Sequence, residues 1–167
     1  VTSMTAFVKE VYTSFWQSGR GPMLGVAFAL LPMGAMALAY AMLSTIQVDY
    51  GLDSNQIARL QVYNTLASAL GCIAGGLLGD RFGAKRVVAA GFLLSAIITF
   101  SLGWQISSLG LQSVPREVFY SIVIAHGLFF GMSFGVRNAI FMGMTNPAIA
   151  ATQFTAFMGM SNLAISF

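Results

Sequence analysis

Charged side chains are scarce in this 167-residue sequence. Asp, Glu, Lys and Arg together make up 8% of it, and hydrophobic residues make up 57%. A soluble domain carries roughly 25% charged residues, so this composition predicts a protein that lies in a lipid bilayer. The formal net charge of +3 at pH 7 comes without a basic aromatic surface, which argues against nucleic acid as a partner.

Cysteine and histidine each occur once, as Cys72 and His126. A lone cysteine cannot form an internal disulfide, and this pair cannot supply the ligand cluster of a metal site. The apolar segments hold no carboxylate pair and no nucleophile elbow. Their glycines do not follow a strand, so a phosphate-binding loop is excluded by its context. We therefore expect no enzyme activity, cofactor or metal.

Long apolar stretches separate the few charges. A membrane-spanning helix needs about 20 apolar residues. Five segments qualify or nearly qualify: 22–48, 57–79, 87–105, 118–144 and 147–167, the last of them truncated. The predicted fold class is all-α, a polytopic membrane helix bundle. Because the sequence starts without a signal peptide and stops inside an apolar run, we expect it to be a fragment of a longer protein.

An amphipathic helix is predicted over residues 4–18, ahead of the first apolar segment. Its apolar residues recur at helical spacing, namely Phe7, Val8, Val11, Tyr12, Phe15 and Trp16. The segment is too polar to span and suits the membrane interface. Helix starts are predicted after Asp53, at Pro115 and at Asn146-Pro147, from residues that favour the first turn. A polar loop is expected over 107–113.

The charges segregate between alternate gaps. Basic residues gather on one side, at Lys9, Arg20, Arg81, Lys85 and Arg86, whereas the other gaps hold Asp49, Asp53, Arg59, Arg116 and Glu117. The positive-inside rule makes the first side, and the amino end, cytoplasmic. We expect a bacterial cytoplasmic membrane, with a eukaryotic organelle membrane as the alternative.

The fourth apolar segment contains His126, Ser133 and Arg137 within about 20° of one helix face. An ionisable side chain costs about 2.5–3.5 kcal/mol at a membrane helix centre, so this stripe is the first candidate to line a substrate cavity. An interhelical hydrogen bond for His126 and snorkelling of Arg137 remain alternatives. Asn64 and Tyr40 are further substrate-binding candidates; interhelical bonding is the alternative for Asn64, and Met and Ala around Tyr40 indicate packing.

Glycines four residues apart in the second and fourth segments indicate close helix packing. They are Gly71, Gly75 and Gly79, and Gly127, Gly131 and Gly135. The third segment has no ionisable residue and is expected to face lipid.

A charged loop joins the second and third segments. Its sequence, Gly76-Leu-Leu-Gly-Asp-Arg-Phe-Gly-Ala-Lys-Arg86, resembles the signature loop of the major facilitator superfamily. The resemblance implies that Asp80 engages a helix end of the opposite transporter half and that Arg81, Lys85 and Arg86 hold a cytoplasmic gate. A carboxylate can accept N–H groups at a helix start, and Gly76 and Gly83 suit close approach and a sharp turn. Gly79 belongs to the same gating motif. A basic turn that only sets topology is the alternative.

A second stretch, residues 145–155, resembles the start of the penultimate helix in muropeptide permeases and their acetyl-CoA transporter relatives. That resemblance implies a carboxy-terminal half, with 1–21 as the cytoplasmic linker and 22–167 as a partial half; the amino-terminal half is the alternative. It also implies that the first and fourth helices line the cavity and that transport is coupled to protons. No Asp or Glu lies in the five segments, so coupling would use His126 or a carboxylate elsewhere.

The resulting hypothesis is a secondary active transporter that moves a polar, anionic metabolite, such as a muropeptide-like conjugate, by alternating access. Its partners are the small-molecule substrate, the bilayer and the other transporter half. A transport-inactive receptor or scaffold of the same fold is the alternative, and an intramembrane enzyme that uses His126 is a third.

Overall fold

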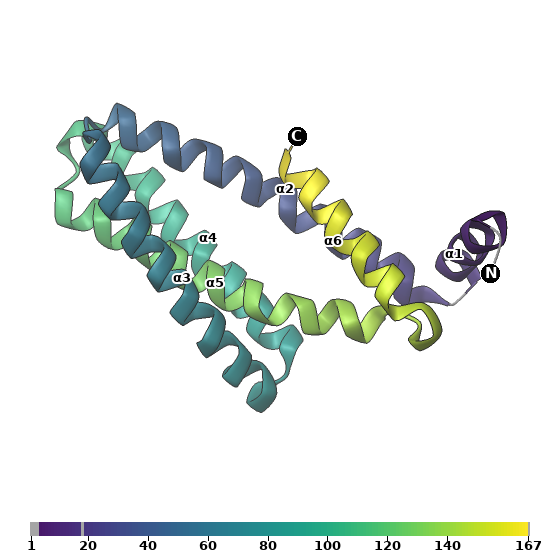
Figure 1. Ribbon diagram of the computed structural model, residues 1–167. Coiled ribbons are helices and arrows are strands. Elements are labelled where there is room, and N and C mark those ends of the chain that lie inside the picture. The colour runs from purple at the N-terminus through teal and green to yellow at the C-terminus, as the bar shows by residue number, and fades with distance from the viewer. Residues whose placement is uncertain (1–3, 18, 167) are drawn as a thin grey trace. The chain divides into compact units, whose positions relative to one another are not determined.

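The computed structural model describes residues 4–17 and 19–166, apart from some side chains, chiefly those of 31–42 (Figure 1). The elements are α1 (Met4–Gln17), α2 (Arg20–Asp49), α3 (Ser54–Phe82), α4 (Ala84–Leu109), η1 (Leu111–Ser113), α5 (Arg116–Met144), η2 (Pro147–Ile149) and α6 (Ala150–Ser166). No strand occurs in the described residues, so the all-α prediction is confirmed.

Among the described residues, three helices are long and apolar enough to cross a membrane. They are α3 with 29 residues, α4 with 26 and α5 with 29. At about 1.5 Å of rise per residue, each exceeds the roughly 30 Å of a bilayer core. The protein is therefore a membrane protein. Within the described residues α2 contributes a shorter apolar stretch, Arg20–Leu30, and spans at α2 and α6 stay predictions.

The helix ends follow local hydrogen bonding. The α3 start is a capping box, in which the Gln56 N–H donates to Asp53 Oδ1 at 2.9 Å and the Asp53 N–H donates to Gln56 Oε1 at 3.1 Å. This confirms the cap predicted at Asp53. It also starts the helix at Ser54, three residues before the predicted apolar stretch.

One predicted boundary is wrong, and another is confirmed only in part. The loop expected over 107–113 is largely helical, because α4 continues to Leu109 and η1 follows at once. Gly110 ends α4 with φ 82° and donates its N–H to the Ile106 carbonyl at 2.9 Å. Helical structure begins at Pro147 as predicted, but its first turn, Pro147–Ile149, is a 3₁₀ turn and the α-helix follows from Ala150. Gln153 Oε1 accepts the Asn146 N–H at 2.6 Å, so the N–H group just before this turn has a hydrogen-bond partner.

The chain divides into two compact units, which we describe separately. Unit 1 comprises the described residues up to Leu43 and from Ile140, and unit 2 comprises Ser44–Ala139. The core of unit 1 is Ala29, Phe141 and Phe157, none of which is exposed. The rings of Phe141 and Phe157 stack with centroids 5.4 Å apart, and Phe15 of α1 meets Phe157 edge-on at 5.9 Å. The amphipathic α1 thus packs an aromatic residue on α6.

Unit 2 is built on reciprocal glycine packing between α3 and α5. Gly71 and Gly75 of α3 press against the backbone carbonyls of Leu128 and Met132. In return, Gly131 and Gly135 of α5 face the backbone of α3 at Ser68 and Cys72, and Gly127 faces the side chain and carbonyl of Asn64. A Cβ atom at any of these positions would collide with the other helix. The predicted packing role of both glycine series is confirmed, and the two helices touch backbone to backbone.

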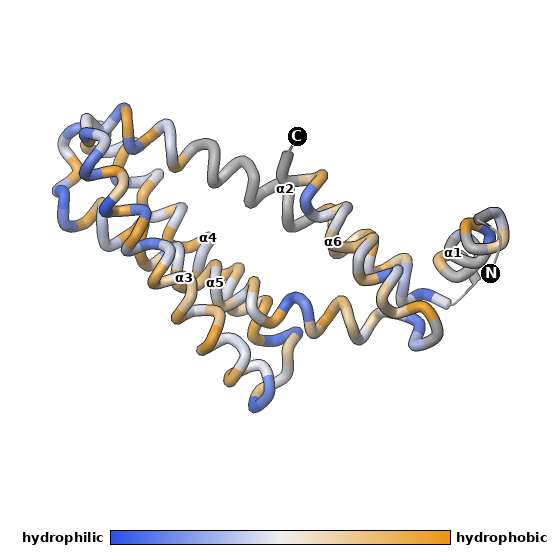
Figure 2. The backbone as a smooth tube through the Cα atoms, viewed as in Figure 1, coloured by the Kyte–Doolittle hydropathy of each residue, from blue (hydrophilic) through white to orange (hydrophobic). Residues whose placement is uncertain are grey.

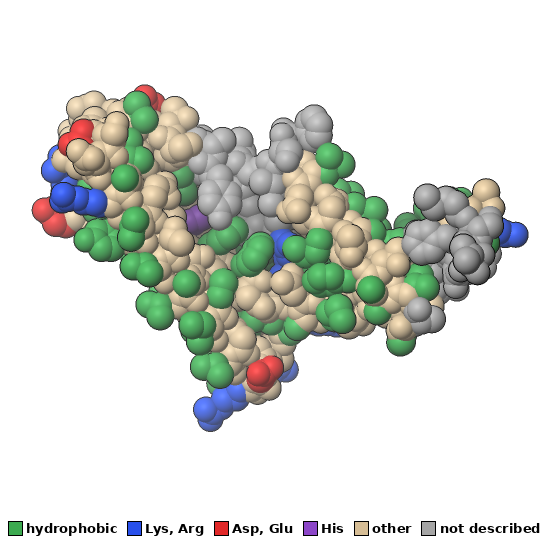
Figure 3. Space-filling view, viewed as in Figure 1, with side chains coloured by type: hydrophobic (Ala, Val, Ile, Leu, Met, Phe, Trp, Pro, Cys, Tyr) green, Lys and Arg blue, Asp and Glu red, His purple; other side chains and the backbone are tan. Residues whose placement is uncertain are grey.

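Charge marks the two ends of unit 2. Hydropathy along the chain shows blue segments at the ends of the helices of unit 2, a further blue segment within α5, and mostly paler or orange segments elsewhere (Figure 2). In the space-filling view, blue and red side chains gather at the α3–α4 turn and at the opposite end, around the α2–α3 connection and η1 (Figure 3). Every charged side chain of unit 2 is exposed at these ends except Arg137. This separation is what a bundle in hydrocarbon requires.

Candidate functional site

Arg137 is the one buried charge of unit 2. It lies in α5, and only 2% of its surface is exposed. Its guanidinium carbon stands 4.9 Å from the centroid of the Phe134 ring, a cation–π contact. A snorkelling arginine would extend to a surface, and this side chain does not. The burial argues against snorkelling, and a cavity role for Arg137 stays a prediction.

Two phenylalanines connect His126 to Arg137 along α5. The His126 and Phe130 rings stack with centroids 6.1 Å apart and planes 19° apart, and Phe130 and Phe134 stack at 6.1 Å and 22°. We call His126, Phe130 and Phe134 the α5 ladder. Our sequence analysis missed both phenylalanines, although Phe130 and Phe134 follow His126 at successive intervals of four residues, the spacing of neighbours on a helix surface.

The Ser133 side chain lies in the contact between α4 and α5. It is 1% exposed, and its hydroxyl donates to the Phe129 carbonyl at 3.2 Å and reaches the Val88 carbonyl of α4 at 3.5 Å. Its Oγ also occupies the space beside Gly91, where a Cβ would collide with it. The structure therefore places Ser133 at the α4–α5 contact. A substrate contact there stays a prediction.

Asn64 lies against α5 at Gly127, the residue after His126. Its Oδ1 is buried and accepts no hydrogen bond within the described residues. The structure thus brings Asn64 to the turn of α5 that carries His126. The other candidate, Tyr40, falls in α2, and its side chain is outside the described residues.

The charged loop is a turn of a single residue. Gly83 separates α3 from α4 with φ 92° and ψ 132°, and its N–H donates to the Gly79 carbonyl at 2.9 Å. Such a conformation is open to glycine and strained for other residues, so the sharp turn predicted at Gly83 is confirmed.

The other loop residues divide into packed and open positions. A Cβ at Gly79 would lie 3.0 Å from Val136 Cγ1 of α5, whereas a Cβ at Gly76 would have no described atom within 4 Å. Close approach at Gly76 stays a prediction. The four charged side chains are exposed, namely Asp80, Arg81, Lys85 and Arg86. Arg81 lies over the neighbouring Phe82 ring at 5.5 Å.

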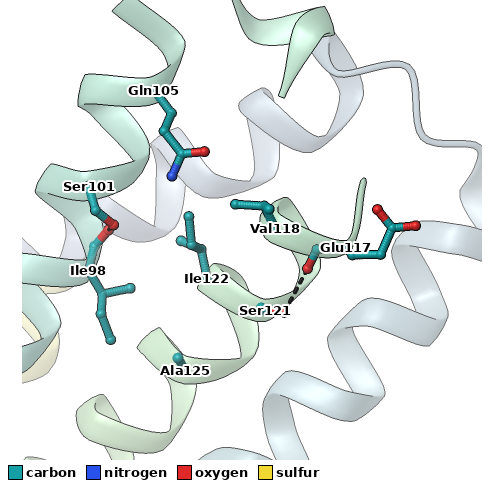
Figure 4. Close-up of a pocket in the computed structure, with 8 residues that line it drawn as sticks. All are labelled: Ile98, Ser101, Gln105, Glu117, Val118, Ser121, Ile122 and Ala125. Atoms are coloured by element: carbon teal, nitrogen blue, oxygen red, sulfur yellow. Dashed lines mark hydrogen bonds between the residues drawn. The ribbon is translucent and has the colours of Figure 1, made fainter. Parts of the chain in front are cut away.

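A groove of about 410 Å³ opens between α4 and α5 near η1 (Figure 4). None of the substrate-binding candidates from the sequence lines this groove, so it is a separate site from the stripe of His126, Ser133 and Arg137 on α5.

No model of a known protein family matches this sequence, and no solved structure matches it significantly.

Proposed function

We propose that this chain is part of a secondary active transporter that moves a polar, anionic small molecule by alternating access, with α5 lining the substrate path. The observation that carries the proposal is the burial of Arg137 within a membrane-length helix. A cation held at that depth costs several kcal/mol unless it is partnered or faces a polar path, so such residues usually serve function.

The chemistry of the α5 face fits an anion attached to a ring. The Arg137 guanidinium can bind a carboxylate or phosphate through two parallel hydrogen bonds. The α5 ladder next to it offers aromatic edges and faces to an apolar or sugar ring. Asn64, with a buried carbonyl oxygen that lacks a described donor, supplies an acceptor beside His126. A sugar–peptide conjugate with a free carboxylate has all three complementary parts.

The charged turn at Gly83 fits the gate of such a transporter. Its exposed Asp80 is available to accept N–H groups from a helix start in another half, and Arg81, Lys85 and Arg86 surround it with positive charge. The likeness of this loop to the major facilitator signature supports the same role. The proposal includes coupling to protons, for which His126 is the titratable imidazole within α5.

The test is flux into proteoliposomes that contain the intact protein, with and without a pH gradient. The substrates are radiolabelled sugar–peptide conjugates and matched analogues with an amidated carboxylate. We expect Arg137→Gln to lower uptake of the carboxylated substrates about tenfold or more, because a hydrogen bond to a charged group contributes roughly 1.5–3 kcal/mol. Arg137→Lys keeps the charge but loses the paired geometry, so its uptake should be intermediate.

Arg59→Gln is the matched control, since Arg59 is exposed near the start of α3. It should transport at the wild-type rate. Thermal unfolding of each variant in detergent checks that lost uptake is not lost fold. Wild-type flux in a folded Arg137→Gln variant would refute the substrate role of Arg137. If no tested compound accumulates with the wild-type protein, the transporter proposal fails in favour of a receptor or scaffold.

A further inference from the structure

The groove between α4 and α5 has an apolar floor and a polar end. Its eight lining residues are Ile98, Ser101, Gln105, Glu117, Val118, Ser121, Ile122 and Ala125. At about 410 Å³, its volume lies within the roughly 300–1,000 Å³ typical of small-molecule sites. Figure 4 shows Gln105 reaching toward Val118, while Glu117 stands at the rim with its carboxylate directed away from the floor.

The two serine hydroxyls in the groove are already engaged by backbone. Ser121 Oγ donates to the Glu117 carbonyl at 2.6 Å, and Ser101 Oγ donates to the Ile98 carbonyl at 2.8 Å. The remaining polar groups are the Gln105 amide and the Glu117 carboxylate, both at the end nearest η1. A ligand that fills this groove is therefore apolar along most of its length and polar at one end.

Exposed aromatic residues indicate the depth of that polar end in the membrane. Trp104, the neighbour of Gln105, is 66% exposed, and Phe100 one turn away is 70% exposed. Tryptophan is enriched at the membrane–water interface, where one end of its ring meets lipid and the other meets water. The polar end therefore lies at headgroup level, and the apolar floor at Ile98, Ile122 and Ala125 lies at the depth of acyl chains.

Charge at the rim selects the headgroup. Glu117 lines the groove at its rim and is exposed, whereas its neighbour Arg116 is exposed but is not a lining residue. The carboxylate of Glu117 complements a headgroup that carries an ammonium. A headgroup with a phosphate alone would bring a second anion to Glu117 without a partner for it.

We propose that this groove binds a membrane glycerophospholipid whose headgroup carries a protonated amine. One acyl chain lies along Ile98, Ile122 and Ala125, the ammonium pairs with Glu117, and Gln105 bonds to the ester or phosphate region. This site stands apart from the transport proposal and involves none of its residues.

The test uses the intact protein in phosphatidylcholine nanodiscs that contain a small fraction of a lipid with a diazirine in its acyl chain. The diazirine lipid has an ethanolamine, choline or glycerol headgroup. After illumination, mass spectrometry locates the labelled peptides. We expect labelling of residues 98–105 and 118–125, strongest with ethanolamine, because choline has no N–H to donate and phosphoglycerol has no cation.

Two variants separate the floor from the rim. Ala125→Phe fills the groove and should abolish this labelling. Ala96→Phe should leave the labelling intact, because Ala96 is exposed and is turned about 200° around α4 from the groove residue Ile98. Glu117→Gln should lower the preference for ethanolamine by up to about fivefold, the upper limit for an exposed ion pair, and Asp49→Asn at the same end should not. Equal labelling by the three headgroups, strongest labelling by phosphoglycerol, or no labelling of these peptides would each overturn the proposal.

Discussion

Neighbouring glycines in α3 provide a direct test of the α3–α5 contact. A methyl group at Gly75 would lie 2.9 Å from both the carbonyl carbon and the Cα of Met132, and still closer to the carbonyl oxygen. These are backbone atoms of a packed helix, so they cannot rotate away. At Gly76, one residue further along, a methyl group would meet no described atom within 4 Å.

Gly75→Ala and Gly76→Ala therefore share one effect and differ in another. Both gain roughly 0.5–1 kcal/mol because alanine loses less backbone entropy than glycine in a helix interior. Only Gly75→Ala also forces two backbones apart, an overpacking cost of about 1–3 kcal/mol. The shared gain cancels between the two variants, and their difference in unfolding free energy should be that 1–3 kcal/mol.

The assay is reversible unfolding of the intact protein in mixed micelles of increasing sodium dodecyl sulfate, followed by circular dichroism. Gly76→Ala should unfold at the same or a higher denaturant fraction than wild type, and Gly75→Ala at a lower one. Equal midpoints for the two variants would refute the backbone contact at Gly75. A destabilised Gly76→Ala would instead show that something outside the described residues covers that position.

Two further substitutions test the ends of α3. Gly83→Ala should lower the unfolding free energy by on the order of 1–3 kcal/mol, since a residue with a side chain is strained at φ 92°. The control is Gly103→Ala in the open interior of α4, which should not destabilise the protein. Equal unfolding midpoints for the two variants would contradict the strained turn at Gly83. Asp53→Ala should cost about 0.5–2 kcal/mol by removing the acceptor of the Gln56 N–H. Hydrogen exchange in the first turn of α3 should then accelerate, whereas Asp53→Asn, which keeps an oxygen acceptor, should leave it nearly unchanged.

The helices were largely predictable because their causes are local. Apolar length determined α3, α4 and α5, and Asp53 marked a start through hydrogen bonds made within four residues of chain. The predicted end of α4 was too early because the local composition was misleading. Ser107 and Ser108 resemble loop residues in composition, yet a helix next to water tolerates them until Gly110 adopts a positive φ.

The candidate site was less predictable because it depends on which faces meet. Helical spacing placed Ser133 on the stripe of His126 and Arg137. It could not show that Ser133 Oγ would fit beside Gly91 of α4. The same spacing applies to Phe130 and Phe134, but in an apolar helix the sequence does not distinguish these two from other apolar residues. Only the structure shows their rings stacked between His126 and Arg137.

The packing contacts of α5 and its proposed transport residues lie on different parts of the helix surface. Gly127, Gly131 and Gly135 meet α3, while Phe129, Met132 and Ser133 lie toward α4 at Gly91. The α5 ladder lies between the side of α5 that meets α3 and the side that meets α4. Viewed down the helix axis, His126 points about 100° away from Gly127, and each later ring of the ladder is turned about 40° further toward Gly127. Phe130 lies about 60° from the direction of Gly127, so its substitution should leave the α3–α5 contact intact, whereas Phe134, about 20° from that direction, borders the contact. A loss of transport at Phe130 without a change in unfolding free energy would then support the proposed substrate path along α5.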